Sequence, residues 1–436
     1  MATTKYSHAF LVGSFNRPLG PQEISNAGWK AEIIHADGND RYRNDRGYNG
    51  LCTLFYKAHI DAMLESDSEL QINRPDFLKD VHHYYYDVPK EQQIVNFNNI
   101  KEDIDYQLRI CKLHIFTFPL DISLFSIEID DTGQELEAIT MGHFVLARWA
   151  WGWDRNFMPL KEQLSQTLEP LRKLLPSQDL KNLISGGNKL KIFQTFKLDI
   201  DEPDDKMLYE IASCSSIGCI DDKTDRNSPA TTYWKSIVDN NSVSTFRNWK
   251  ALALVDTFTM MGNENSFDED DCNFLYFPLI YIRCVFEKNF CFSRNTLYRE
   301  DRADRKLSDQ IGLMEQYYFY DNISHNFQPN LLYQAMAKGL GIKEEREELS
   351  KQIKEKAKKD KEDKKEREEK RFDNILAGVS IFAVISVIWD FCSIVKDASG
   401  VDSNTSVPTY ARIFIAVGFV LIVFLWYIIY RKKDGQ

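Results

Sequence analysis

A short tract rich in arginine and tryptophan is the part of this sequence best suited to bind a small ligand. Between Gly142 and Asn156 the chain reads GHFVLARWAWGWDRN. An arginine beside a tryptophan can stack on a purine base and neutralise a phosphate. The alternative is that these aromatic side chains pack in a core or in a subunit interface. The residues expected to contact a nucleotide-like ligand are Arg148, Trp149, Trp151, Trp153 and Arg155.

The common short signatures of catalysis are missing from the sequence. It contains no GxxxxGK[ST] phosphate loop, no GxSxG nucleophile elbow and no HExxH helix. The 8 cysteines form no CxxC pair and have no histidines at zinc-binding spacing, which favours a reduced cytosolic domain. The acidic string at residues 268–271 either offers oxygen ligands to a divalent cation or forms a solvated loop. We expect no catalytic residues and no enzymatic activity.

A stripe of small side chains, some of them polar, is expected along one face of an apolar segment near the C-terminus. Its members recur at the spacing of a helical turn. A carboxylate in lipid costs about 3 kcal/mol or more, so Asp390 is expected to face an aqueous lumen or a partner. In a lumen, a ring of such carboxylates attracts cations. The alternative is that Asp390 is hydrated at the outer interface. The residues expected to line a pore are Asp373 and Asn374 at its inner mouth, and Ala383, Ser386, Asp390 and Ser393.

Two apolar segments are long enough to cross a bilayer. Residues 375–395 read ILAGVSIFAVISVIWDFCSIV, and residues 413–430 read IFIAVGFVLIVFLWYIIY. As helices of about 20 residues they are roughly 30 Å long, which matches the hydrocarbon core of a membrane. Basic residues precede the first span and form the tail at 431–436, whereas the link at 396–412 is nearly neutral, so we expect both termini in the cytoplasm. The alternative is a helical hairpin buried in a soluble core.

A highly charged segment at residues 342–374 joins the first span to the rest of the chain. Basic and acidic side chains occur in similar numbers at positions three or four apart, which favours a solvated helix over disorder. Because no proline or glycine separates this segment from Ile375, we expect one stalk helix from about Ile342 to Val395.

Residues 1–341 are expected to form a cytosolic α/β domain, a mixed sheet with helices, with a break into two subdomains near residues 160–188. A net charge of -11 argues against direct binding to nucleic acid. Packed helices are expected after Cys272, with Pro278 near the start of the first. A helix is predicted over residues 135–148, and strands over residues 113–130 with a break at Pro119, 190–200, 208–220 and 249–261.

A cytosolic α/β part, a long helix that continues into a first span, a short external link and a second span together resemble the CorA family of divalent metal-ion transporters. The family's Gly-Met-Asn motif is missing, and KDASG at residues 396–400 stands in its place. The chain is therefore similar to the CorA-like proteins that accompany type III CRISPR systems. This resemblance implies a homopentamer in the bacterial inner membrane, and an antiviral effector gated by a nucleotide messenger such as the conjugate of S-adenosylmethionine with AMP (SAM-AMP).

Several functions stay open at this point. The leading hypothesis is a ligand-gated channel whose partners are the lipid bilayer, further copies of the chain and a small nucleotide-like ligand. The alternatives are a housekeeping transporter of a divalent cation such as Mg²⁺, a non-conducting membrane scaffold and a membrane-tethered nucleotide hydrolase. The missing catalytic signatures count against the hydrolase.

Overall fold

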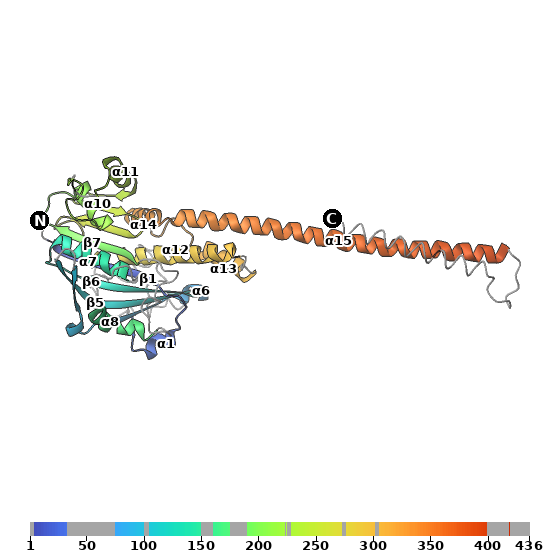
Figure 1. The fold of residues 1–436 in the computed structure, drawn as a ribbon, viewed down its shortest axis with the longest axis horizontal. Coiled ribbons are helices and arrows are strands. Elements are labelled where there is room, and N and C mark those ends of the chain that lie inside the picture. Colours follow the sequence, from blue (N-terminus) through green and yellow to red (C-terminus); the bar gives the residue numbers. More distant parts are fainter. Residues whose placement is uncertain are drawn as a thin grey trace. The chain divides into compact units, whose positions relative to one another are not determined.

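The structure is a computed structural model, and it describes residues 4–32, 75–99, 104–149, 160–174, 190–222, 224, 228–272, 276–300, 305–398 and 418 (Figure 1). The chain divides into two compact units, Met1–Gln352 and Ile353–Gln436. The first unit contains the sheet and the helices that cover it. The described part of the second unit is almost entirely one helix.

A mixed sheet forms the centre of the first unit. Its strands are β1 (Thr4–Ser14), β2 (Lys30–Ala31), β3 (His82–Asp87), β4 (Ile94–Asn99), β5 (Ile104–Phe118), β6 (Ile122–Asp130), β7 (Lys191–Leu198), β8 (Ser242–Val243), β9 (Trp249–Ala253) and β10 (Thr257–Gly262). Within the described residues the order is β2-β3-β5-β6-β1-β7-β10-β9-β8, with β4 paired to β5. Among these strands β7 and β10 pair in parallel, and the other neighbours pair antiparallel. The predicted mixed sheet is therefore confirmed.

The β5–β6 hairpin confirms the break predicted at Pro119. The chain reverses through Leu120 and Asp121, which have φ angles of 65° and 64°, a conformation that is uncommon for residues other than glycine. Because alternate side chains of a strand point to opposite faces, Ile115 and Phe118 of β5 pack on different sides of the sheet. Ile115 belongs to the core beneath the helices before β7, whereas Phe118 stacks on Phe286, with ring centroids 4.2 Å apart.

Helices cover both faces of the sheet. On one face lie α7 (Leu136–Trp149), which confirms the helix predicted over 135–148, α8 (Leu160–Thr167) and α9 (Glu169–Arg172). On the other face lies α12 (Phe277–Arg299), followed by α13 (Arg305–Tyr317), which confirms the helices predicted after Cys272. The remaining short elements are α1 (Pro21–Asn26), α6 (Asp76–Lys79), η2 (Lys90–Gln92) and η5 (Glu269–Cys272).

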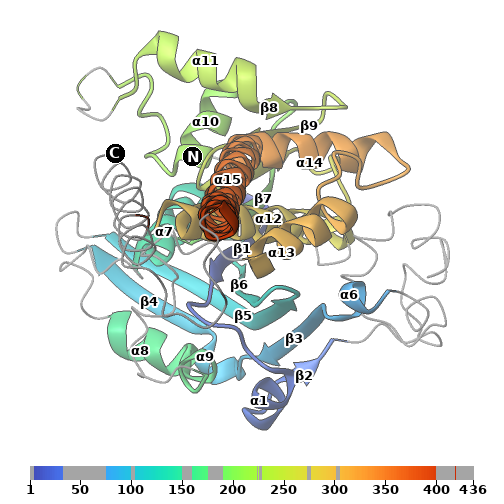
Figure 2. The same cartoon turned by 90° about the vertical axis from the view of Figure 1, so that its right-hand side faces the viewer.

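The strand predicted over 208–220 is wrong, because α10 (Asp205–Ser213) occupies the start of this segment. The side chain of Asp204 caps the helix by accepting a hydrogen bond from the Met207 backbone N–H at 3.0 Å. Leu208 and Ile211 lie one turn apart and are both fully buried, which is the pattern of a helix rather than a strand. The helix α11 (Thr231–Asn241) follows, and Figure 2 shows α10 and α11 together beside β8 and β9.

The single strand predicted over 249–261 is also wrong, since β9 and β10 form an antiparallel hairpin there. The Leu254 N–H donates to the Thr257 carbonyl at 2.7 Å and closes the turn. The strand predicted over 190–200 is confirmed as β7. Because β7 pairs with β1, strands from before and after residues 160–188 share one sheet, and this segment does not divide it.

A helix of 57 residues, α15 (Ile342–Ala398), follows α14 (Phe327–Gly339). The uninterrupted helix predicted from the missing breakers is confirmed, and at 1.5 Å per residue it is about 85 Å long. Among the described residues, α15 is the one helix that is long and apolar enough to cross a membrane, judged by length and composition. The second predicted span, at residues 413–430, falls almost wholly outside the described residues.

Candidate functional site

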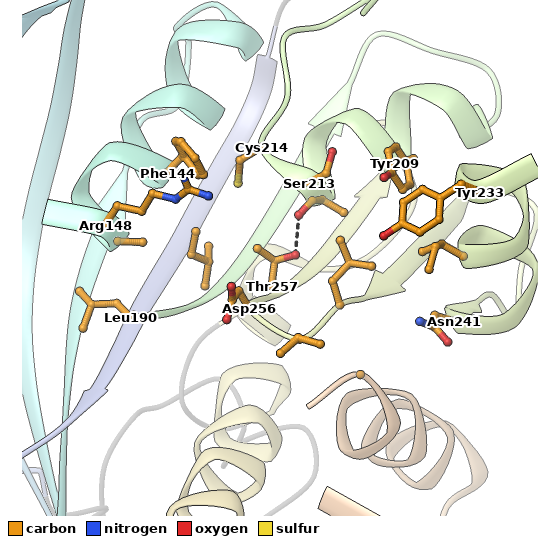
Figure 3. Close-up of a pocket in the computed structure, with 17 residues that line it drawn as sticks. Phe144, Arg148, Leu190, Tyr209, Ser213, Cys214, Tyr233, Asn241, Asp256 and Thr257 are labelled. Atoms are coloured by element: carbon orange, nitrogen blue, oxygen red, sulfur yellow. Dashed lines mark hydrogen bonds between the residues drawn. The ribbon is translucent and has the colours of Figure 1, made fainter. Parts of the chain in front are cut away.

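A pocket of about 340 Å³ lies between the end of α7, the helices α10 and α11, and the turn that joins β9 to β10 (Figure 3). This volume is at the lower end of the range for pockets that take small molecules. Its lining comes from segments far apart in the sequence, because β7 carries the chain back across the sheet beside β10. The pocket is our candidate ligand site.

Arg148 provides the positive charge of the pocket. It lies in the last turn of α7, four residues after Phe144, and its guanidinium carbon is 3.8 Å from the centroid of the Phe144 ring. Within the part of the chain that the structure describes, no carboxylate forms an ion pair with Arg148, and its buried Nε has no hydrogen-bond partner. A guanidinium is a donor suited to an anionic group of a ligand.

Two tyrosines form the side of the pocket opposite Arg148, as Figure 3 shows. Tyr209 on α10 is buried, and burial raises the pKa of its hydroxyl group, which stays a hydrogen-bond donor at neutral pH. Tyr233 on α11 is 58% exposed and lies at the pocket mouth. Their rings offer apolar faces to a planar group such as a base.

The β9–β10 turn forms the floor of the pocket and is fixed on two sides. Lys191 forms an ion pair with Asp256 at 2.7 Å and donates to the Val255 carbonyl at 3.1 Å. Thr257 Oγ1 donates to the Ala212 carbonyl of α10 at 2.5 Å. The Asp256 side chain is still 38% exposed, so it can accept a hydrogen bond from a ligand.

The described lining residues offer charged, polar and aromatic groups to a ligand. No histidine lies among the described lining residues. Among the described lining residues the one serine, Ser213, shares a hydrogen bond with Ser215 at 2.9 Å and donates to the Glu210 carbonyl at 3.3 Å. A guanidinium on one side, aromatic rings on the other and a carboxylate on the floor suit a ligand with a planar ring and an anionic group.

The candidates from the sequence tract at 142–156 divide into three groups. Arg148 lines the pocket, and Trp149 is the last residue of α7. Trp151, Trp153 and Arg155 lie outside the described residues. The sequence analysis missed the partners of Arg148 across the pocket, Tyr209, Tyr233 and Asp256, because no local pattern marks residues that only the tertiary fold brings together.

All six pore candidates lie on α15, and their side chains are exposed: Asp373, Asn374, Ala383, Ser386, Asp390 and Ser393. Large apolar side chains beside them are exposed as well, including Phe382 at 75% and Trp389 at 76%. No part of the apolar stretch of α15 is buried by the described residues of this chain. Within the described residues this segment is therefore not a core helix, and its length and composition fit a membrane span.

A row of polar side chains crosses four strands of the sheet, β3, β5, β6 and β1. His83 and His114 are joined at 3.0 Å, and Glu128 accepts from His114 at 2.8 Å and from His8 at 2.9 Å. Tyr6 donates to His8 at 3.1 Å. Burial works to raise the pKa of Glu128, but the hydrogen bonds from both histidines outweigh it and hold this pKa well below the usual range. Burial, and then the charge of His114, lowers the pKa of His83.

The described residues contain no cluster of three or more histidine, cysteine, aspartate or glutamate side chains arranged to hold a metal ion. In the acidic string, Glu269 instead contacts Lys197 at 3.4 Å. This finding covers only the described part of the chain.

No family model matches this chain, and no curated protein or solved structure matches it either.

Proposed function

We propose that this protein is an oligomeric membrane channel whose cytosolic domain binds a nucleotide-like ligand that gates it. The observation that carries this proposal is the continuity of α15. Ile342 and Leu349 at its start are buried in the unit that contains the pocket, and the same helix continues into an exposed apolar stretch of membrane-spanning length. A change at the pocket therefore has a continuous, rigid element through which to act on the membrane.

The energetics of the apolar stretch favour insertion into lipid. Moving one large apolar side chain from water to an apolar environment contributes about 2 kcal/mol. The stretch exposes many such side chains, so their sum exceeds the cost of about 3 kcal/mol for the one carboxylate, Asp390. Residues 413–430 supply the second span in this proposal.

One such hairpin cannot enclose a water path, so conduction requires several copies around an axis. The resemblance to the CorA family implies five. We assign Asp390, Ser386 and Ala383 to the lumen, where a ring of carboxylates concentrates cations such as Mg²⁺, the transported substrate. Both termini then lie in the cytoplasm of a bacterial cell, and the channel lies in its inner membrane.

The pocket supports a nucleotide as the ligand, because Arg148 suits a phosphate and the tyrosine rings suit a base. Following the resemblance to CRISPR-associated CorA-like proteins, SAM-AMP is the first ligand to test, and the biological role is antiviral defence. Binding gates the pore only if the ligand has different affinities for the closed and open states.

The experiment is cation flux from liposomes that contain the purified full-length protein, with SAM-AMP, AMP or no nucleotide on the cytosolic side. The proposal predicts flux that rises when one nucleotide is added. Flux that is high without any nucleotide supports the housekeeping transporter instead. No flux under any condition, together with a protein that stays in solution without detergent, contradicts the proposal.

A further inference from the structure

Three polar side chains lie along one face of α12 and are almost fully buried. Arg283, Glu287 and Asn295 are four and eight residues apart, a spacing that places them on the same side of a helix. Arg283 and Glu287 are 0% exposed, and Asn295 is 1% exposed. Burial of charged and polar groups is unfavourable unless other groups pair with them, so the partners of this face show what α12 holds.

Glu287 is the centre of this face, because its one carboxylate holds two guanidinium groups. Arg283 Nη1, on the preceding turn of α12, donates to Glu287 Oε2 at 2.6 Å. Arg346, in the second turn of α15, forms an ion pair with Glu287 Oε1. Tyr333 on α14 donates to Oε2 at 3.1 Å and accepts from Arg346 Nη2 at 2.9 Å. The helices α12, α14 and α15 therefore meet at one buried carboxylate.

The segment that follows α13 completes the surroundings of the two guanidinium groups. The Arg346 guanidinium carbon is 4.6 Å from the centroid of the Phe319 ring, and its Nη1 is 3.3 Å from Asp321 Oδ1. Arg283 Nη2 donates to the Tyr318 carbonyl. The Arg346 side chain is only 20% exposed, so solvent and salt screen its ion pair less than they screen a surface pair.

Two further side chains of α12 hold the chain where α15 begins. Asn295 donates to the Glu345 carbonyl at 3.1 Å and to the Glu345 carboxylate at 2.7 Å. Lys288 donates to the carbonyl of Leu340, which lies two residues before α15. Together with the Glu287 ion pair, these contacts tie α12 to residues 340, 345 and 346.

The corner between α14 and α15 offers an alternative, a hinge. Gly341 has a φ of 67°, a left-handed conformation that glycine adopts without strain, and hinges are often small residues at the ends of elements. A hinge there would let the root of α15, residues 342–349, swing while α12 stays in place. Such a swing requires Arg346 to separate from Glu287.

The cost of that separation decides between the two alternatives. Breaking a buried ion pair typically shifts an equilibrium by a factor of about 150–4,000. A ligand typically changes the affinity at a second site by a factor of about 5–150. Binding at the pocket is therefore too weak to pull Arg346 away from Glu287, even before the contacts of Asn295 are counted.

We propose that Glu287 joins α12 and the root of α15 into one rigid body, so that the stalk moves only together with α12. Gly341 then sets the angle of the corner and does not act as a hinge. A ligand moves the stalk by displacing α12 on the sheet. This last step rests on the proposed function, whereas the rigid body exists without any ligand.

The pocket and α12 lie on opposite faces of the same two strands. Ile192 of β7 and Thr257 of β10 line the pocket. The next residues, Phe193 and Phe258, contact Tyr281 of α12, with ring centroids 5.6 and 6.4 Å apart. Because neighbouring residues of a strand point to opposite faces, a ligand that shifts these strands also shifts the surface on which α12 rests.

The test is amide hydrogen exchange on the full-length protein in detergent, without nucleotide. In the wild type, the amides of residues 346–349 and those of α12 should open together, with protection that agrees within about tenfold. The main substitution is Arg346→Met, because Glu287 keeps Arg283 as a buried cation. It is expected to raise exchange in the root about 10–100-fold, the effect of losing a hydrogen bond to a charged group, and to leave α12 unchanged.

Lys343→Met is the matched control, because Lys343 lies in the same root and its side chain is 82% exposed. Its root should exchange as in the wild type. Tyr333→Phe is a second variant, which removes only the hydroxyl between Glu287 and Arg346 and should raise root exchange several-fold even if Arg346→Met fails to fold. The proposal is overturned if the wild-type root exchanges more than a hundredfold faster than α12, or if neither variant differs from the control.

A flux experiment then separates this inference from the proposed function. In liposomes with SAM-AMP as the probe, the Arg346→Met protein should keep its affinity for the nucleotide and lose most of the nucleotide-dependent rise in cation flux. A wild-type protein that shows no binding or flux counts against the proposed function, and the exchange result still decides on the rigid body. Normal gating by an Arg346→Met protein whose root exchanges faster would contradict the claim that the stalk moves with α12.

Discussion

Replacement of Arg148 by methionine is the most direct perturbation of the candidate pocket. The side chain has no carboxylate partner among the described residues, so removing its charge leaves no described carboxylate unpaired. We therefore expect the free energy of unfolding to stay within about 0.5 kcal/mol of the wild type, as for substitutions outside packed or paired sites. Methionine also keeps apolar contact with the Phe144 ring.

Nucleotide affinity should change much more than stability. A hydrogen bond to a charged group contributes about 1.5–3 kcal/mol, and 1.4 kcal/mol is about a tenfold change in a dissociation constant. Arg148→Met should therefore weaken SAM-AMP binding about tenfold to a hundredfold in isothermal titration calorimetry. Arg148→Lys should recover part of the loss, because lysine keeps the charge and loses the planar fork.

Arg172→Met is the control for this experiment. Arg172 lies outside the pocket lining and forms its ion pair with Glu169, three residues earlier in the same short helix, at 2.9 Å. Such a surface pair contributes about 0–1 kcal/mol, and its loss should leave the affinity unchanged. If Arg148→Met binds the nucleotide as tightly as the Arg172 variant does, the assignment of the pocket as the ligand site is refuted.

Three further predictions concern the packing, the pH dependence and the pore. Gly339→Ala should lower the free energy of unfolding by about 1–3 kcal/mol in urea titrations, because the new methyl group meets the backbone of β9, whereas Gly312→Ala, with open space around it, should raise stability by up to about 1 kcal/mol. The pKa of His83 in the folded protein lies well below 6.5, so the unfolded state binds more protons below that pH, and stability should fall as the pH drops below about 6.5. His83→Gln, which can still donate to His114, should flatten that fall, and an unchanged pH profile would exclude His83 as its source. Asp390→Ala should lower cation flux or change its selectivity in liposomes, and an unaltered current would remove Asp390 from the lumen.

The parts of the fold that could be predicted from the sequence are those that local rules decide. Pro119 marked the β5–β6 turn, and the absence of proline and glycine between Ile342 and Ile375 marked α15 as one helix. The strand predicted over 208–220 was wrong at α10 because a short apolar run fits the period of a helix and of a strand about equally well. Asp204, which caps the helix, was a signal that favoured the helix. The β9–β10 turn at Leu254–Asp256 lacks glycine, proline or asparagine, so no turn signal separated the two strands.

The candidate site was predictable only at Arg148, where arginine and aromatic residues gather in one tract. Tyr209, Tyr233 and Asp256 come from separate elements that meet because β10 pairs in parallel with β7. These two strands are far apart in the sequence, and no pattern within either segment predicts that they pair.

Current recording from the full-length protein in a planar bilayer tests the central claim most directly. With SAM-AMP on the cytosolic side, we predict discrete cation-conducting openings that are rare without the nucleotide and that disappear or change in selectivity with Asp390→Ala. A silent bilayer in the presence of reconstituted, nucleotide-bound protein would contradict the account.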